Sequence, residues 1–552
     1  MEKIWLKKYD LKVRHSLSYD PARTMVSFLE EAAQNFPKQL CLIGETTQFT
    51  YEETLEKVTF VAQNLVRMGI KKGQKIGLSL PNIPEFILAY YGILRAGAVV
   101  VAINPFYRER EYTYQVKDAG IDWLICSAEK VDEYLTLIKQ GLIERLVYVQ
   151  TESDASNKPG EHNHPTINDY SNHVLPFHQL TKVPEQVSVL PEVEPDDVTI
   201  LQYSGGTTGE PKGAIGLHRN LAANTLQFTE WLSICEAGKE VVLTAIPLYH
   251  VYGMVVAMNV GIALGASLVL IKNPRDIYGI LEAIQKNSAT LFPGVPNMYA
   301  AINQLPAVMQ GNYNLKSIKV CISGSAPLSP ETKRTFEAFI SGTLVEGYGL
   351  SEAPTATHCN PVSGDNRAGS IGLPLPDVEC KIVDLENSSV ELPIGESGEL
   401  LIKGPQVMKG YHQRSEETNI ALKDGWLHTG DIAYVDQDGY FYLVARKKEL
   451  IKIGGFQVWP REIEEVLAGN PMIQEVAVAG VPGLHLTEKV KAWIVLKPGA
   501  QMTEHEVRRW CSNSLAGYKV PTLVEFVNEL PRTTVGKVLK RELIRRHLEQ
   551  NT

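Results

Sequence analysis

Two long, mainly apolar stretches dominate the pattern of hydrophobic and polar positions along the chain. Residues 87–103 start with apolar positions at helical spacing, break at Gly97 and continue as the apolar run Val99–Ile103. Residues 253–271 carry no charge and repeat this order, ending in Leu268–Ile271. A charge-free stretch of this length could span a bilayer, but its internal glycines and its change of period predict a buried helix, a tight turn and a buried strand. We therefore expect two buried helix-to-strand crossovers.

The two stretches also resemble each other in sequence. In both, a Gly-Ala pair precedes the strand and an Asn-Pro pair follows it, at 104–105 and at 273–274. Helices that alternate with buried strands predict mainly parallel sheets covered by helices on both faces. We expect two related doubly wound α/β subdomains. Residues 151–197 are polar and lack a period, which predicts a surface excursion between them.

Farther along the chain the pattern changes to short strands and then to a new amphipathic unit. Residues 370–440 are rich in glycine and contain short apolar runs such as 399–403, which predicts a small distorted β-barrel. Pro460 then opens an amphipathic helix, and strands follow over 475–478 and 490–496. The end of the chain therefore predicts a compact α+β module with a core of its own.

Composition and charge are those of an ordinary soluble globular protein. A length of 552 residues exceeds what one core can bury, and 44% hydrophobic with 21% charged residues is a usual balance. The net charge of −9 argues against a nucleic-acid binder, which needs a basic field. Seven scattered cysteines without a CxxC pair indicate reduced thiols of a cytoplasmic protein. The charged amino terminus has no apolar segment behind it, so a signal peptide is not expected.

Residues 203–213, with the sequence YSGGTTGEPKG, are the strongest indication of chemistry. Glycines let backbone N–H groups turn toward a ligand, and the threonines and Lys212 add hydroxyl donors and a cation, which together make a cradle for phosphate oxygens. The apolar run 198–201 predicts a strand that delivers this loop to a sheet edge. A Walker A loop needs glycine before its lysine and Ser or Thr after it, whereas Pro211 and Gly213 flank Lys212. The sequence predicts a different nucleotide loop, with a flexible surface turn as the alternative.

Two shorter motifs add groups that suit a nucleotide. In 346–352, EGYGLSE, Tyr348 could stack on a base, and Glu352 could hold Mg²⁺ because a hard cation prefers oxygen ligands. In 425–431, GWLHTGD, the carboxylate of Asp431 could accept hydrogen bonds from both ribose hydroxyls. A turn with a buried tyrosine and a capping aspartate are the alternatives.

Two basic segments near the carboxyl end say little on their own. Residues 446–460 combine charges with a Gly-Gly turn, which alone predicts a solvated linker face. Residues 531–537, PRTTVGK, place a lysine on a glycine turn.

In this order, the five segments resemble the adenylate-forming superfamily, which contains acyl-CoA synthetases, firefly luciferase and the adenylation domains of peptide synthetases. The resemblance extends from about residue 25 to about residue 545. Within the superfamily, several segments are similar to bacterial long-chain fatty-acyl-CoA ligases, namely 201–209, 404–408, 446–448, 455–464 and 517–521.

This resemblance implies a two-step reaction and a two-domain fold. The carboxylate of a medium- to long-chain fatty acid would attack the α-phosphate of ATP, giving acyl-AMP and pyrophosphate, and CoA would then take the acyl group. The implied fold class is α/β. A large N-terminal domain over 1–447 would contain two doubly wound subdomains and the distorted barrel, and residues 448–552 would form a small mobile α+β domain.

The resemblance also implies roles for individual residues. Thr208 and Glu352 would support Mg²⁺. Lys537 would bridge the substrate carboxylate and the α-phosphate, and loss of such an interaction typically costs on the order of 10²–10³ in rate. The residues implied for ATP and AMP are Ser204, Gly205, Gly206, Thr207, Thr208, Gly209, Lys212, Gly324, Ser325, Ala326, Glu346, Gly347, Tyr348, Gly349, Ser351, Asp431, Arg446 and Lys537.

Other residues are implied for the acyl group and for CoA. His250 would lie near the acyl carboxylate, in a pocket with Val251 and Tyr252, although an isolated histidine on an apolar segment is more often a satisfied core residue. Lys448 would be the hinge about which the small domain swings between the two steps. The swing would bring a CoA-binding loop to the site, made of Gly454, Gly455, Phe456 and Gln457. The implied catalytic set is Lys537, Lys448, Lys452, His250 and Glu352.

Alternatives stay open within and outside the enzyme class. An aryl-CoA ligase of the coumarate type is one. An acyl-AMP ligase that loads a carrier protein is another, but such enzymes usually carry an insertion near the domain junction, whereas Val444 runs straight into the hinge here. A non-catalytic scaffold would have lost the catalytic lysines, and a membrane transporter would use the apolar stretches as spans. No nucleic-acid partner is expected; a homodimer and a peripheral contact with the inner face of the membrane stay open.

Overall fold

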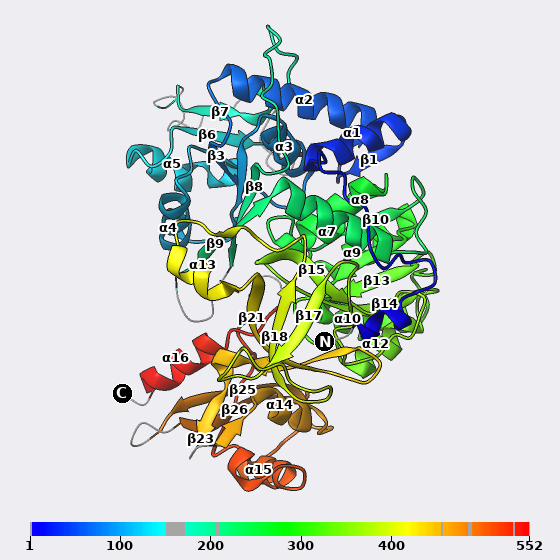
Figure 1. Cartoon of the computed structure of the whole chain (residues 1–552), viewed down its shortest axis with the longest axis vertical. Coiled ribbons are helices and arrows are strands. Elements are labelled where there is room, and N and C mark those ends of the chain that lie inside the picture. Colours follow the sequence, from blue (N-terminus) through cyan, green and yellow to red (C-terminus); the bar gives the residue numbers. More distant parts are fainter. Residues whose placement is uncertain are drawn as a thin grey trace.

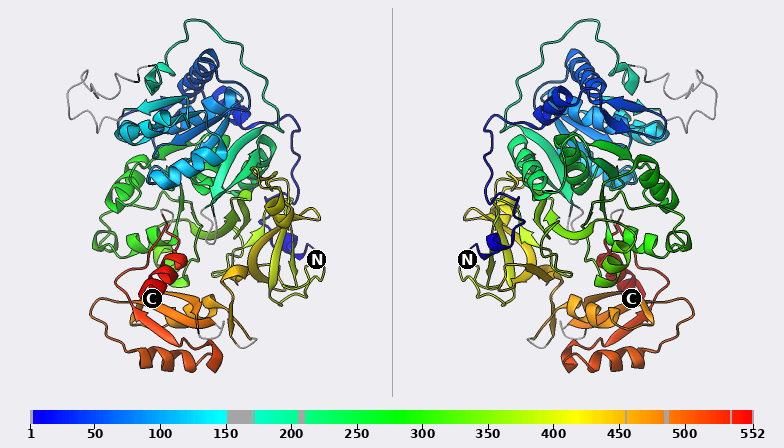
Figure 2. Two further views of the ribbon diagram at one scale, coloured as in Figure 1. Left: turned by 90° about the vertical axis from the view of Figure 1, so that its left-hand side faces the viewer. Right: turned by 90° about the vertical axis from the view of Figure 1, so that its right-hand side faces the viewer.

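The computed structural model describes residues 3–150, 170, 172–204, 210–453, 456–483, 488–533 and 536–550. Within these residues the strands form five sheets, of which two are large and mainly parallel (Figure 1). Helices pack between and around these two sheets, and the elements after residue 450 lie together at one end of the molecule (Figure 2). The predicted α/β fold class is confirmed.

The first large sheet has eight strands in the order β19-β9-β8-β4-β3-β5-β6-β7, parallel from β8 to β7. Neighbouring residues of β5 face opposite sides of the sheet, so Leu124 packs with helices α4 and α5 while Ile125 packs with α2 and α3. This first subdomain is therefore doubly wound, as predicted. Its bounds are β3 Lys75–Ser79, β4 Val99–Ala102, β5 Trp123–Ser127, β6 Arg145–Val149, β7 Val174–Pro176, β8 Val198–Ser204, β9 Lys212–Leu217, β19 Gly410–Tyr411, α2 Tyr51–Arg67, α3 Pro84–Arg95, α4 Glu109–Ala119, α5 Val131–Lys139, η2 Ala128–Lys130 and η4 Phe177–Gln179.

The second large sheet has nine strands in the order β16-β15-β14-β13-β12-β10-β11-β1-β2, parallel from β14 to β1. One face packs on α9, α10 and α12, and the other joins the core shared with the first sheet through α1 and α7. Its bounds are β1 Leu40–Ile43, β2 Gln48–Thr50, β10 Val241–Thr244, β11 Ser267–Leu270, β12 Leu291–Gly294, β13 Val320–Ser323, β14 Thr343–Leu350, β15 Ala353–Cys359, β16 Leu373–Pro374, α1 Met25–Asn35, α7 His218–Trp231, α9 Ile277–Asn287, α10 Pro296–Asn303, α11 Pro306–Met309 and α12 Pro330–Glu337.

Both predicted helix-to-strand crossovers are confirmed. Helix α3 leads through the turn at Gly97 into the buried strand β4. The π-helical turn η5, Gly253–Asn259, and helix α8, Val260–Ala263, lead into β11 in the same way. In the part of the chain that the structure describes, no helix is long and apolar enough to cross a membrane.

The predicted barrel is an open antiparallel sheet. Strands pair in the order β17-β18-β21-β20, and β22 lies along the rest of the long strand β21, so the described strands do not close into a ring. On its other edge, β22 bonds to the residues just before β16, since the N–H of Phe441 donates to the carbonyl of Gly372 at 3.0 Å. The bounds are β17 Glu379–Val383, β18 Gly398–Lys403, α13 Ser415–Ala421, β20 Leu422–Lys423, β21 Trp426–Val435, β22 Phe441–Arg446 and η6 Lys447–Glu449.

The amino-terminal segment packs on this open sheet, although it is far away in sequence. The helical turn η1, Ile4–Lys8, buries Trp5 against Phe441. The hydroxyl of Tyr9 donates to the carbonyl of Pro374, 365 residues away, at 2.5 Å. The hydroxyls of Ser16 and Tyr19 both donate to Asp377. The first residues of the chain thus pack against Pro374 and Phe441, which most of the chain precedes in sequence.

Residues 451–550, the C-terminal module, contain two apolar clusters of their own. The predicted helix after Pro460 and both predicted strands are confirmed. The bounds are β23 Ile451–Ile453, β24 Phe456–Val458, α14 Pro460–Ala468, β25 Ile473–Pro482, β26 Glu488–Leu496, α15 Glu504–Ser512, η8 Gly517–Lys519, β27 Leu523–Phe526 and α16 Lys540–Gln550.

The contact of the amino-terminal segment with the open sheet makes Gly439 hard to replace. Gly439 has φ of +91°, and a Cβ atom there would lie 2.7 Å from Cα of Trp5, whereas Gly395 has φ of +89° and open space. We expect Gly395→Ala to lower the free energy of unfolding by about 1 kcal/mol through backbone strain alone. Gly439→Ala must also displace Trp5, and we expect a loss of about 2–4 kcal/mol. Urea unfolding of both variants tests this, and equal losses would contradict it.

Candidate active site

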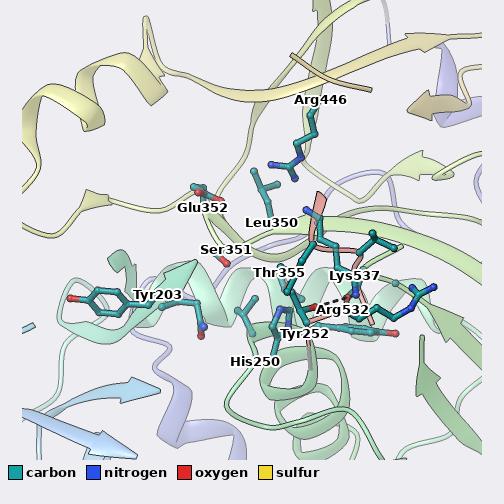
Figure 3. Close-up of a pocket in the computed structure, with 18 of the residues that line it drawn as sticks. Tyr203, His250, Tyr252, Leu350, Ser351, Glu352, Thr355, Arg446, Arg532 and Lys537 are labelled. Atoms are coloured by element: carbon teal, nitrogen blue, oxygen red, sulfur yellow. Dashed lines mark hydrogen bonds between the residues drawn. The ribbon is translucent and has the colours of Figure 1, made fainter. Parts of the chain in front are cut away.

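A cleft of about 1030 Å³ lies between the C-terminal module and the rest of the chain. Part of its wall follows the carboxyl ends of β4, β8 and β13, where open α/β sheets bind ligands. The module contributes Arg532 and Lys537 (Figure 3) and further residues, among them Lys540 and Ile544. The predicted site residues that line the cleft are His250, Val251, Tyr252, Gly324, Ser325, Gly347, Tyr348, Gly349, Ser351, Glu352, Arg446, Lys448 and Lys537.

Lys537 enters this cleft from the module. Burial is the largest of the causes that lower the pKa of its ammonium to about 8; the nearby cations Arg446 and Lys448 act in the same direction, and Asp431 and Glu449 oppose them. The pKa of Lys448 is also lowered, first by burial and then by Arg446. Three cations in one partly buried cleft favour an anionic ligand that carries more than one charge.

His250 lies close enough to Lys537 for the two to interact electrostatically. Burial, and then the Lys537 cation, lower the pKa of the imidazole to about 4, so the ring is neutral at neutral pH. Its Nδ1 accepts a hydrogen bond from the backbone N–H of Tyr252 at 3.2 Å. The ring proton of the neutral form is therefore on Nε2, which can donate to an oxygen in the cleft.

Gly324 and Ser325 form a wall of the cleft beyond the end of β13. The hydroxyl of Tyr252 donates to the carbonyl of Ile322 at 2.8 Å, and its ring lies 3.2 Å from where a Cβ of Gly324 would be. Ser325 has φ of +69°, a left-handed conformation that is unfavourable for a residue with a side chain. Such strain is typical of binding sites.

Asp431 lies just behind the cleft and fixes two residues that line it. Its carboxylate accepts from the hydroxyl of Tyr348 at 2.6 Å and from Nε of Arg446 at 2.7 Å. Strand pairing of β21 with β22 sets Asp431 directly opposite Arg446. The carboxylate thus neutralises Arg446 and orients the aromatic ring at the same time.

Glu352 lines the cleft on the side away from Lys537. Its Oε1 accepts from the hydroxyl of Tyr411 at 2.8 Å. The same tyrosine ring lies under the ammonium of Lys212, 5.4 Å from its centre, and Lys212 also lies 3.6 Å from Glu417. Sequence reasoning missed Tyr411, because its link to Glu352 is a tertiary contact across 59 residues that no local pattern signals.

The predicted phosphate loop joins two antiparallel strands. The pairing of β8 with β9 sets Ser204 opposite Lys212. The hydroxyl of Tyr203 donates to Asp118, which also pairs with Arg414 at 2.5 Å, so one end of the loop is anchored. The loop residues themselves, Gly205, Gly206, Thr207, Thr208 and Gly209, lie outside the described residues, as do Gly454 and Gly455.

Other predicted residues do not line the cleft. Glu346 is buried below it, and burial raises the pKa of its carboxyl to about 8, so the group is mostly neutral at neutral pH. Ala326 and Lys212 also lie off the described wall of the cleft. The backbone of Lys452, Phe456 and Gln457 belongs to the hairpin of β23 and β24.

Comparison with known proteins identifies this architecture. A model of the AMP-binding enzyme family matches residues 29–412, and a model of the AMP-binding enzyme C-terminal domain matches residues 462–537. The chain belongs to the AMP-binding enzyme family.

Relatives of this AMP-binding enzyme extend over its whole length. It is 38% identical to the long-chain-fatty-acid–CoA ligase of Bacillus subtilis, over 100% of this chain and 99% of that protein. It is 34% identical to the 4-coumarate–CoA ligase of Vanilla planifolia, over 94% and 92% of the two chains. The crystal structure of ATP-bound MatB from Rhodopseudomonas palustris superimposes with a TM-score of 0.84 at 29% identity, over 96% and 100% of the chains. Apo MatB gives 0.74 at the same identity and coverage, so the present arrangement is more similar to the ATP-bound form.

The lowered pKa of Lys537 predicts unusual reactivity. At pH 8 about half of the Lys537 side chains are in the free-amine form. This fraction is on the order of 10² times that of a lysine with the ordinary pKa of about 10.4. We expect an amine-directed acylating reagent at pH 8 to modify Lys537 first, and ATP to protect it. Peptide mass spectrometry after brief labelling measures this. Uniform labelling of all lysines would contradict the lowered pKa.

Proposed function

We propose that this enzyme activates a medium- to long-chain fatty acid with ATP to form acyl-AMP and pyrophosphate, and then transfers the acyl group to CoA. The observation that carries the proposal is the presence of Lys537 in the cleft beside His250, in a chain that matches a long-chain-fatty-acid–CoA ligase from end to end. The product is an acyl thioester, which makes the protein an acid–thiol ligase.

The first step prepares the acyl group for transfer: the carboxylate attacks the α-phosphate and pyrophosphate leaves. In the second step the thiol of CoA displaces AMP, which is a far better leaving group than oxide. The ammonium of Lys537 neutralises the carboxylate and the α-phosphate as they approach, and this charge stabilisation is greatest in the transition state. Neutral His250 donates from Nε2 to a carboxylate oxygen and so orients the attacking group. Arg446 and Asp431 lie beside Tyr348, in positions that suit the ribose and the base.

Mg²⁺ fits this cleft as a partner of the nucleotide. Glu352 and Ser351 present oxygen ligands of the kind that Mg²⁺ prefers. The described residues contain no group of three His, Cys, Asp or Glu side chains that could hold a metal ion by themselves. The ion would therefore take most of its ligands from phosphates and water, as Mg²⁺ at nucleotide sites usually does, with Glu352 and Thr208 as protein ligands. Bound there, it would neutralise phosphate charge.

CoA transfer requires a second arrangement of the C-terminal module. We place the domain boundary between residues 447 and 448, where β22 has ended and the turn η6 crosses to the module. Rotation about Lys448 would withdraw Lys537 and present Lys452 with Gly454, Gly455, Phe456 and Gln457 to the pantetheine. The better superposition on ATP-bound than on apo MatB supports the first-step arrangement for the present structure.

A coumarate-type aryl-CoA ligase is the second candidate, favoured by the similarity to the enzyme of Vanilla planifolia. Pyrophosphate release with acids from acetate to oleate, and with coumarate, separates the two. We expect activity to rise from acetate to the C12–C18 acids and to remain low with coumarate. Acyl-CoA should form only when CoA is added. A response limited to aromatic acids would overturn the fatty-acid proposal.

The role of Lys537 predicts a pH dependence of the first step. The cation is required, so kcat/KM for ATP should fall as pH rises through about 8, the value to which burial lowers the pKa in the free enzyme. Lys537→Ala should lower pyrophosphate formation on the order of 10²–10³-fold. It should leave thioester formation from supplied acyl-AMP largely intact. Equal loss of both steps would contradict this role.

A further inference from the structure

Lys537 stands on a short turn whose backbone is closed by its own hydrogen bonds. The N–H of Lys537 donates to Oγ1 of Thr533 at 3.1 Å, and its carbonyl accepts from the N–H of Thr533 at 2.8 Å. The N–H of Gly536 donates to the carbonyl of Thr533 at 2.9 Å. These bonds give the turn its shape, but they do not fix its place in the molecule.

Arg532 ties one side of this turn to the sheet of the C-terminal module. One guanidinium nitrogen donates to the carbonyl of Gly536, the residue before Lys537, at 2.7 Å. Another lies 2.9 Å from a carboxylate oxygen of Glu475 on β25. The planar guanidinium holds both acceptors at a fixed separation, which a lysine ammonium cannot do in the same way.

Lys540 ties the other side, three residues after Lys537 and at the start of α16. Its ammonium lies 2.8 Å from Glu464 on α14 and 3.2 Å from Glu449 in the turn η6. Glu464 is itself fixed, because the same carboxylate oxygen accepts from the backbone N–H of Val478 at 2.7 Å. The side chain of Lys540 is only 20% exposed, so this ion pair is better shielded from water than a surface pair.

Both anchors act on residues that flank the catalytic lysine. We propose that Arg532 and Lys540 are positioning residues for the first half-reaction, which together hold the turn so that the ammonium of Lys537 reaches the cleft. The inference rests on the proposed function. Neither residue needs to touch a substrate, because a misplacement of a catalytic group by about 1 Å is enough to cost on the order of 10²-fold in rate.

Measuring the two half-reactions separately distinguishes a misplaced Lys537, which slows only the first, from a folding defect, which slows both. Pyrophosphate release with ATP and dodecanoate measures the first step, which uses Lys537, and CoA transfer from synthetic dodecanoyl-AMP measures the second. We expect Arg532→Met and Lys540→Met each to slow the first step about 10- to 100-fold and to change the second less than about threefold.

Conservative variants and a matched control sharpen the test. Lys540→Arg keeps a cation between both carboxylates and should restore most of the first step, whereas Arg532→Lys should restore it only in part. Arg545→Met removes another arginine close to the turn, but its partners Glu542 and Glu549 lie on α16 itself. It should leave both steps unchanged.

The pH dependence of kcat/KM for ATP adds a measurement that a simple loss of stability would leave unchanged. If the turn loosens, Lys537 gains water and its pKa rises from about 8 toward the ordinary value, so the alkaline limb of kcat/KM for ATP should shift to higher pH in Arg532→Met. Unchanged first-step rates would overturn the positioning role of Arg532 and Lys540. So would a parallel loss of both steps with a lower melting temperature and an unshifted alkaline limb of the pH profile. Absence of both steps in the unmodified enzyme would instead refute the proposed function.

Discussion

The site depends on holding the Lys537 ammonium, half-buried, beside other cations. Burial and the neighbours Arg446 and Lys448 all disfavour its charge, so the cations of the cleft repel one another. A polyphosphate would offset this repulsion because it carries more negative charge than Asp431 and Glu449 provide. The same positive field that lowers the pKa of Lys537 thus favours a nucleotide in the cleft, and part of this field comes from the C-terminal module.

The fold provides the other half of this arrangement with rigid elements. The two doubly wound sheets share one core, and their strands deliver Tyr203, Gly324 and Tyr348 to a common opening. Strand pairing sets Asp431 opposite Arg446, so the register of β21 with β22 positions that ion pair. These elements face the C-terminal module, which has its own apolar core. Because units with separate cores usually move relative to one another, we expect such movement here.

Much of this could be predicted from the sequence, because local pattern and motif agree. The periodicity of 87–103 and 253–271 was sufficient for the buried crossovers, and the glycine-rich motifs indicated which side chains meet at the cleft. Pairing was harder. Glycine-rich short strands predicted a barrel, but the order in which the strands pair around β21 and β22 is a tertiary property that these motifs do not signal. Tyr411, Arg532 and Lys540 were missed as site residues for a related reason, since each has a partner far along the chain, namely Glu352, Glu475 and Glu464, and the motif at 531–537 does not reveal those partners.

The amino-terminal segment has a consequence for the order of folding during synthesis. Tyr9 is synthesised first, and Pro374, which accepts its hydrogen bond, follows 365 residues later. At about 5–20 residues per second, the segment remains without its partner strands for roughly 20–70 s. Trp5 and its neighbours therefore stay exposed on the nascent chain, where a chaperone can bind them, until nearly the whole large domain has been translated.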